Sequence, residues 1–232
     1  MSLNIVILAA GVGSRLGKPH PKPLTPLNTG ETILGRSLRL LTSRFSRVTP
    51  NLVVGFKKEV IMEEVPDVGF VYNQDYGDTN TSKSLLKALK TIGPGGVLWL
   101  NGDVVFDPQV LDALLPKIAT DRSFISVNTA SVSDEEVKYT LGADGFINQL
   151  SKTVPTESAL GEAVGINYIS ADDRIRLAQR LDEVDAQDYF ERGIELAIEK
   201  DGAKFEAVDI SSHNVIEVDF EDDLQSANKQ FQ

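Results

Sequence analysis

Short apolar runs alternate with amphipathic stretches over the first 130 residues, and this alternation predicts strands and helices in turn. A continuous apolar run bounded by turn residues is typical of a strand covered on both faces of a sheet. We expect such strands at 5–9, 52–54, 70–72, 97–100 and 123–129. Leucines at helical spacing, as at Leu34, Leu38 and Leu41, predict helices between them. The sequence therefore predicts an α/β fold with a mostly parallel sheet and a ligand crevice at the carboxyl ends of its strands.

The pattern changes after about residue 130. Two runs, 137–141 and 146–150, flank Gly142-Ala143-Asp144-Gly145 and predict a β-hairpin over the sheet edge. Further along we expect strands at 164–169, 204–210 and 215–219, helices at about 172–181 and 187–199, and a final helix with an acidic first turn. No linker or repeat interrupts the chain, so the simplest expectation is a single domain over 1–232.

Composition restricts the kinds of site and partner that the chain can have. Hydrophobic residues make up 41% of the chain and charged residues 25%, which is typical of a soluble globule, and we expect neither a membrane span nor a signal peptide. The chain has no cysteine, which excludes thiolate nucleophiles and zinc–sulfur sites and is compatible with the cytoplasm. Its net charge of −11 disfavours nucleic acid and membranes as partners. An anionic substrate would need a local basic pocket, and residues 15–22 are the best candidate.

A glycine-rich loop follows the first strand. Gly11, Gly13 and Gly17 are spaced G-x-G-x-x-x-G, whereas a dinucleotide-binding fingerprint needs G-x-G-x-x-G opening a helix directly. Four prolines between residues 19 and 26 instead keep the chain out of a helix until about Thr32. A Walker loop needs G-K-[ST], which Gly17-Lys18-Pro19 does not supply. What remains is an extended basic loop.

This loop has the groups that bind a nucleoside triphosphate. Glycines let backbone N–H groups approach oxyanions as a nest. Arg15 can clamp phosphate oxygens in a bidentate fork, and Lys22 can act as a point charge. The prolines make the loop stiff.

The stretch LAAGVGSRLGKPHPKPLTPL, residues 8–27, resembles the signature of nucleotidyltransferases that activate sugar phosphates and phospho-alcohols. Its pattern is L-A-A-G-x-G-x-R-L followed by P-K-x-L. Three later stretches also fit: YNQDYGDTNTSKSL at 72–85, LNGDVVF at 100–106 and VIEVDFEDDL at 215–224. The first and last of these most resemble the small cytidylyltransferases for phosphocholine, aminoethylphosphonate or inositol phosphate. Val215 stands where those enzymes often have tryptophan.

The resemblance implies a Rossmann-like three-layer αβα fold with a small hairpin and helical elaboration on the substrate side. It also implies a nucleotide-binding half, 1–130, and a substrate-side half, 131–232. In the family reaction, a phosphate or phosphonate oxygen attacks the α-phosphorus of a nucleoside triphosphate and expels pyrophosphate. Such a nucleophile is already anionic, so catalysis reduces to positioning and charge neutralisation.

Site residues are implied by the same motifs. Arg15, Lys22 and Asp103 would be catalytic, with Lys22 at the α-phosphate. Asp103 and Asp219 would hold Mg²⁺, and each is expected at a strand end; Glu217 lies two residues back on the same face. The nucleotide would be bound by Leu8, Ala9, Ala10, Gly11, Gly13, Ser14, Arg15, Asn73, Thr79, Asn80 and Ser84. For the last four, ordinary capping of helices and turns is an alternative role.

The acceptor would lie at Glu162 and Tyr189, where a carboxylate and an aromatic face suit a cationic headgroup. The sequence thus favours Mg²⁺-dependent transfer of CMP from CTP to a small phosphorylated or phosphonate acceptor, by a monomer or homodimer. Uridylyl, thymidylyl or guanylyl transfer to a sugar 1-phosphate is the first alternative. A nucleotide-binding regulator without turnover is the second.

Overall fold

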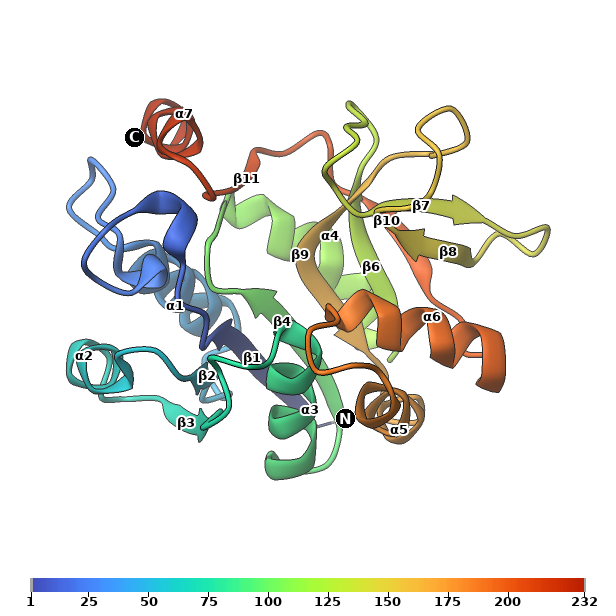
Figure 1. The fold of residues 1–232 in the computed structure, drawn as a ribbon, viewed down its shortest axis with the longest axis horizontal. Coiled ribbons are helices and arrows are strands. Elements are labelled where there is room, and N and C mark those ends of the chain that lie inside the picture. Colours follow the sequence, from blue (N-terminus) through green and yellow to red (C-terminus); the bar gives the residue numbers. More distant parts are fainter. Residues whose placement is uncertain (1, 232) are drawn as a thin grey trace.

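The structure is a computed structural model that describes residues 2–231. Its centre is a nine-stranded sheet with the strand order β10-β6-β9-β4-β1-β2-β3, to which β7 and β8 are attached through β9 (Figure 1). The strands are β1 (Leu3–Ala9), β2 (Asn51–Val54), β3 (Gly69–Tyr72), β4 (Gly96–Asn101), β6 (Phe124–Asn128), β7 (Lys138–Leu141), β8 (Ile147–Ser151), β9 (Glu162–Ile169) and β10 (Glu206–Asp209).

Strands β4, β1, β2 and β3 are mutually parallel, and so are β10 and β6. Strand β9 runs antiparallel to both of its neighbours, β4 and β6. A strand from the second half of the chain therefore lies between two strands from the first half, which joins the halves in one sheet.

Side chains of β1 alternate between two cores, which explains its continuous apolar run. Ile5, Ile7 and Ala9 pack with the helices α1 (Ile33–Arg44), α2 (Lys58–Glu64) and α4 (Pro108–Ala119). Val6 and Leu8 pack on the other face with α3 (Thr81–Thr91), α5 (Arg174–Glu183) and α6 (Phe190–Asp201). Because both faces are covered, the strand has no polar face. The predicted three-layer αβα fold with a mostly parallel mixed sheet is confirmed.

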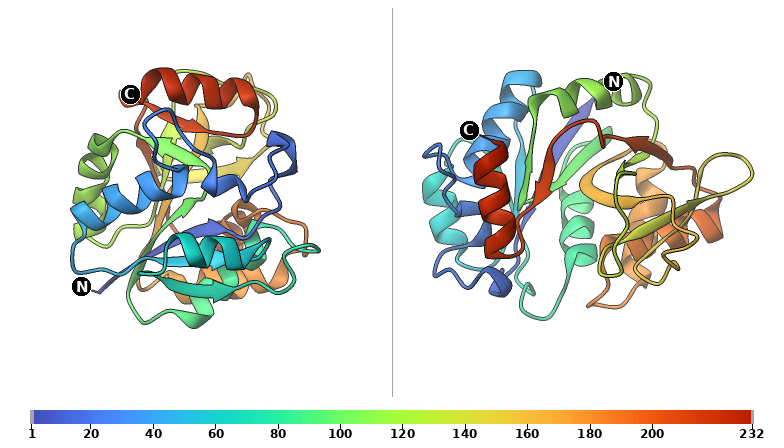
Figure 2. Two further views of the ribbon diagram at one scale, coloured as in Figure 1. Left: turned by 90° about the vertical axis from the view of Figure 1, so that its left-hand side faces the viewer. Right: turned by 90° about the horizontal axis from the view of Figure 1, so that it is seen from above.

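A separate two-stranded ribbon lies beside the main sheet. It pairs β5 (Val104–Phe106) with β11 (Val215–Glu217) in antiparallel register, and it leads into α7 (Glu221–Gln230). Leu224 and Ala227 of α7 pack on Leu16, Leu27 and neighbouring apolar residues of the glycine-rich loop region. Figures 1 and 2 show α7 and the β7–β8 hairpin on opposite sides of the molecule. The ribbon thus ties the end of the chain to the loop near its beginning.

Two elements were not predicted. Helix α2 has only seven residues, of which Ile61 alone is buried, so its sequence carries almost no amphipathic signal. Strand β5 follows β4 after a turn of two residues, and its partner is more than a hundred positions away. Within residues 2–231, no helix combines the length and the apolarity that crossing a membrane requires.

Candidate active site

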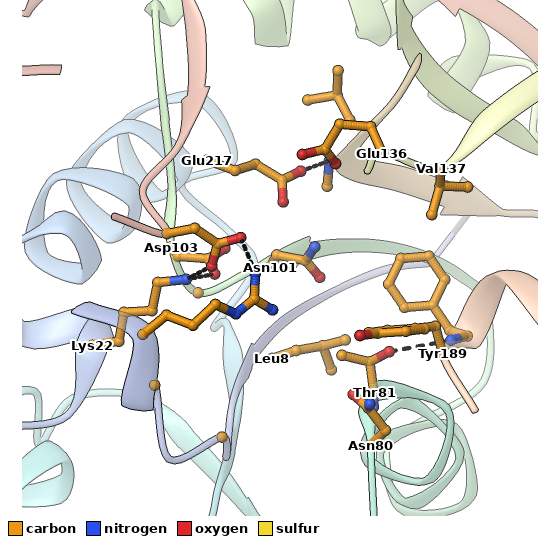
Figure 3. Close-up of a pocket in the computed structure, with 18 of the residues that line it drawn as sticks. Leu8, Lys22, Asn80, Thr81, Asn101, Asp103, Glu136, Val137, Tyr189 and Glu217 are labelled. Atoms are coloured by element: carbon orange, nitrogen blue, oxygen red, sulfur yellow. Dashed lines mark hydrogen bonds and ion pairs between the residues drawn. The ribbon is translucent and has the colours of Figure 1, made fainter. Parts of the chain in front are cut away.

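A cavity of about 600 Å³ opens at the carboxyl ends of β1 and β4 (Figure 3). Leu8 and Ala9 line it from β1, and Asn101, Gly102 and Asp103 line it from the end of β4. This is the position predicted for a ligand crevice, because parallel strands end their backbone hydrogen bonding together at that edge.

The glycine-rich loop forms one wall of the cavity. It contains two short 3₁₀ turns, Ser14–Leu16 and Lys22–Leu24, and the second begins after Pro21 and includes Pro23. Gly13 has φ +64°, and a Cβ there would lie 2.7 Å from the Cβ of Lys22. Both its backbone angle and this close approach require glycine. Gly11, Gly13, Ser14, Arg15 and Lys22 all line the cavity.

Four charged groups meet at this wall. The Nζ of Lys22 donates to Oδ2 of Asp103 at 2.6 Å and also to Oδ1 of Asp219. The Nη1 of Arg15 donates to Oδ2 of Asp219 at 2.9 Å. Burial alone would lower the pKa of Lys22, but the charges and hydrogen bonds of both aspartates outweigh it and raise that pKa. Lys22 is therefore held as a cation between two carboxylates.

The β5–β11 ribbon explains how the distant aspartates come together. Asp103 directly precedes β5 and Asp219 follows β11 by two positions, and the N–H of Val218 donates to the carbonyl of Asp103 at 3.0 Å. The backbone N–H groups of Asp219 and Phe220 both donate to Oδ2 of Asp223, which fixes the turn into α7. We call Arg15, Lys22, Asp103 and Asp219 the phosphate end of the cavity.

Three glutamates line a second charged region of the cavity, and one of them, Glu217, lies near Asp103. Glu136 lies beside Glu217, opposite Tyr189 and Thr81 (Figure 3), and Glu191 completes the group at the start of α6. We call Glu136, Glu191 and Glu217 the acidic wall. Among residues 2–231, no Lys, Arg or His forms an ion pair with any of them.

Burial dominates the electrostatics of the acidic wall. It raises the pKa of Glu191 to about 7, and Oε2 of Glu191 is buried without a hydrogen-bond partner in the described structure. Burial, with the nearby charge of Asp103, raises the pKa of Glu217 to about 8, although Oε1 of Glu217 accepts from the N–H of Gly165 at 2.6 Å. Burial also raises the pKa of Glu136. Lys152, which also lines the cavity, partly offsets this rise in the pKa values of Glu136 and Glu191.

Tyr189 also lines the cavity, and the Nζ of Lys152 lies 5.3 Å from the centre of its ring. Asn80 lines the same side of the cavity (Figure 3) and caps α3, since its Oδ1 accepts from the N–H of Thr81 at 2.8 Å; its own N–H donates to the carbonyl of Ala186 at 2.8 Å. The predicted residues Tyr189 and Asn80 are thus brought to the cavity, and both are available to a ligand.

Five predicted binding residues do not line it. Asn73 is fully buried, and its Nδ2 donates to Oγ1 of Thr79 and Oγ of Ser84, at 3.1 and 3.0 Å. These three side chains hold the 73–84 segment together. The carbonyl of Ala10 accepts from the N–H of Phe56 at 3.0 Å, and Oε1 of Glu162 accepts from the N–H of Ser133. Direct ligand contact by these five residues stays a prediction, and the structure gives each of them a role in holding backbone.

A model of the MobA-like NTP transferase domain matches residues 5–164, which include the glycine-rich loop and Asp103. The chain belongs to this family. The predicted resemblance to nucleotidyltransferases is therefore confirmed at the level of the family.

One relative of this NTP transferase domain is a CMP-5'-(3-aminopropyl)phosphonate synthase from Streptomyces rubellomurinus. It is 38% identical over 121 residues, which are 48% of this chain and only 19% of that protein. Two solved structures share the fold over nearly the whole chain. The CTP:phosphocholine cytidylyltransferase of Streptococcus pneumoniae has a TM-score of 0.77 at 16% identity and covers 100% of both chains. A putative glucose-1-phosphate thymidylyltransferase of Bacillus anthracis has a TM-score of 0.74 at 18% identity and covers 98% of this chain and 94% of its own.

Sequence reasoning missed much of the acidic wall. Glu136 lies in an irregular segment, and Glu191 looked like one more charge on an amphipathic helix, so neither carried a local signal. Glu217 did carry one, because residues two apart on a strand share a face, which places it on the side of Asp219.

Two polar side chains fit a metal ion at the phosphate end. Oδ1 of Asp103 is buried without a hydrogen-bond partner in the described structure. Residues 2–231 contain no group of three or more His, Asp or Glu arranged for a metal. Magnesium commonly binds through one or two carboxylates and completes its shell with water and substrate phosphates. Asp103 and Asp219 match that pattern and would hold it.

Proposed function

We propose that this NTP transferase moves CMP from CTP to a phosphonate or phospho-alcohol that carries an ammonium group, with Mg²⁺ and release of pyrophosphate. The observation that carries the proposal is one cavity with two differently charged regions. At the phosphate end cations and carboxylates are paired, whereas the three carboxyls of the acidic wall form no ion pair among residues 2–231.

The phosphate end supports binding of the triphosphate. The ammonium of Lys22 has three donors, of which two bind carboxylates, so one remains for a phosphate oxygen. The side chain of Arg15 is 55% exposed, and its guanidinium donates only through Nη1 among the described residues, so its other donors are free to bind a polyphosphate in a fork. When bound, magnesium would neutralise phosphate charge and align the oxygens around the α-phosphorus.

Lys22 would contribute most to the rate. Charge develops on the oxygens of the α-phosphate as the acceptor oxygen attacks, and a preorganised ammonium stabilises that charge better than it stabilises the ground state. Because Lys22 is held by two carboxylates, it needs little reorganisation when the reaction occurs.

The acidic wall supports the identity of the acceptor. A neutral sugar gains little from these carboxyls, of which those of Glu191 and Glu217 are buried, whereas an ammonium group would compensate their charge and restore the solvation lost on burial. The exposed face of Tyr189 adds a cation–π surface beside them. The relative that makes a CMP-aminopropylphosphonate is consistent with this class of acceptor.

The test is a matrix of substrates with pyrophosphate release as the readout. CTP, UTP, dTTP and GTP would each be combined with (3-aminopropyl)phosphonate, phosphocholine, inositol 1-phosphate and glucose 1-phosphate, with and without Mg²⁺. We expect release only with CTP, Mg²⁺ and an ammonium-bearing acceptor. Turnover of glucose 1-phosphate with UTP, dTTP or GTP would establish the sugar alternative, and tight CTP binding without any release would establish the regulator.

Replacing a carboxylate tests the metal assignment within the same assay. Asp103→Asn should abolish the Mg²⁺-dependent release, because the amide cannot neutralise a divalent cation. Asp222→Asn, on the exposed first turn of α7, is the matched control and should keep wild-type dependence on Mg²⁺. An Asp103→Asn variant with a normal Mg²⁺ titration would overturn the assignment.

A further inference from the structure

A buried lysine lies behind the acidic wall. Lys138, the first residue of β7, is 2% exposed. Its Nζ donates to the carbonyls of Ser133, Asp134 and Glu136 at 3.3, 3.2 and 3.4 Å, and to that of Lys152 at 2.9 Å. Among residues 2–231 it forms no ion pair, so carbonyl dipoles alone compensate its charge.

The four carbonyls come from two segments that have no regular secondary structure. Three belong to the stretch before β7, and one belongs to the turn after β8. The N–H donors of a buried ammonium must be hydrogen-bonded, because leaving a buried charged group without partners costs far more free energy than leaving a buried neutral group without them. Lys138 therefore holds both segments, 133–136 and residue 152, against its Nζ.

Each segment delivers a charged side chain to the cavity. The first carries Glu136 of the acidic wall, and the second carries Lys152, which lies over Tyr189. Glu162 anchors the first segment a second time, through the N–H of Ser133. The chain around Lys138 is also paired on both sides, with Ser151 of β8 and Glu162 of β9.

We propose that Lys138 is a positioning residue for the acceptor: its ammonium clamps residues 133–136 to residue 152 and so fixes Glu136 and Lys152 at the acceptor end. The inference rests on the proposed function for its kinetic consequence, but the clamp itself does not need a substrate. Lys138 contacts no ligand, since it lies behind the cavity and does not line it.

The kinetic test is Lys138→Met, which keeps an unbranched side chain of similar length and removes the donors. With CTP and (3-aminopropyl)phosphonate we expect KM for the phosphonate to rise about tenfold, because small displacements of positioning groups have large effects, while KM for CTP changes less than about twofold. Lys138→Arg, which restores donors, should recover part of the loss. Lys204→Met removes an exposed lysine from the chain preceding β10 and should behave as wild type.

The test without substrate is amide hydrogen exchange of the free protein. Lys138→Met should speed exchange at 132–137 and 151–154 by at least about tenfold and leave the glycine-rich loop, residues 10–24, unchanged. Glu162→Ala should speed exchange at 132–135 in the same direction, because it removes the second anchor of that segment, but not at 151–154. If Lys138→Met does not fold, Lys138→Gln, which has a shorter side chain and fewer donors, replaces it and should speed exchange in both segments. Unchanged exchange in these segments, or an equal rise throughout the chain, would overturn the clamp. If the wild-type protein turns over none of the substrates, the proposed function fails while the exchange experiment still decides the clamp.

Discussion

The phosphate end and the acidic wall share one cavity and both contain carboxylates, but they differ in how the charge is compensated. At the phosphate end, each aspartate binds Lys22, and Asp219 also binds Arg15. Along the acidic wall, the glutamates form no ion pair in the described structure, and burial raises their pKa values although Lys152 lies near Glu136 and Glu191.

The difference indicates what each end is prepared to meet. A region whose charges are already paired changes little in net charge when a metal ion and an anionic triphosphate enter together. A region of unpaired buried carboxyls pays a desolvation penalty that a cationic ligand can relieve. The two regions of the cavity therefore differ in the charge of the ligand that each would accommodate.

The largest effect is expected from removing the ammonium of Lys22 at the phosphate end. Lys22→Ala should lower kcat by about two to three powers of ten, because its ammonium acts on charge that develops in the transition state. Affinity for CTP should fall much less, and calorimetry beside steady-state kinetics measures the two separately. Lys229→Ala, exposed near the end of α7, is the control. Equal losses of kcat and of CTP affinity would contradict the role assigned to Lys22.

A smaller effect is expected from breaking the acidic wall. Glu191→Gln should raise KM for (3-aminopropyl)phosphonate by about tenfold to a hundredfold, since a buried charged hydrogen bond to the ammonium is lost. KM for CTP should stay unchanged. Glu199→Gln, exposed on the same helix, is the control. If Glu191→Gln affects CTP and the phosphonate alike, the two ends are not separate in function.

The smallest effect is on stability. The carboxyl of Glu191 has an ordinary pKa near 4.5 in an unfolded chain and about 7 in the fold, where it faces Lys152, Glu136 and Glu195. Between these two pKa values the folded state binds more protons than the unfolded chain. The contribution of Glu191 to the free energy of unfolding is therefore present at low pH and is lost as pH rises through 7. The free energy of unfolding should therefore fall, relative to Glu191→Gln, by on the order of 2 kcal/mol between about pH 5 and pH 8.

Thermal unfolding of the ligand-free protein, measured across this pH range, checks the prediction. The Tm of the wild type and that of Glu199→Gln should fall by the same amount as pH rises, and the Tm of Glu191→Gln should fall less. Parallel curves for all three proteins would mean that Glu191 does not hold a raised pKa.

Much of the fold was predictable because parallel strands covered on both faces have continuous apolar runs in their sequence, as in β1 and β4. The phosphate end was predictable for a different reason. Its residues lie in short motifs directly after strands, and topology alone brings the ends of β1 and β4 together.

The acidic wall was not predictable, because burial is decided by tertiary packing. Glu191 has charged neighbours in sequence, and its carboxyl is buried at the start of α6, where the adjacent Phe190 packs on Trp99 of the sheet. The converse holds for Asn73 and Ser84, whose polar side chains suggested ligand contact but bond to each other in the interior. A sequence pattern does not specify which of two polar groups will find an internal partner.

The contact between Lys22 and Asp219 joins residues 197 positions apart. Nothing local can assemble it, so a chain that has folded its sheet but not yet added the β5–β11 ribbon would contain a nearly finished scaffold without its second aspartate. Detaching β11 from β5 would therefore remove Asp219 from Lys22 and Arg15 together, without any change in β1 or β4.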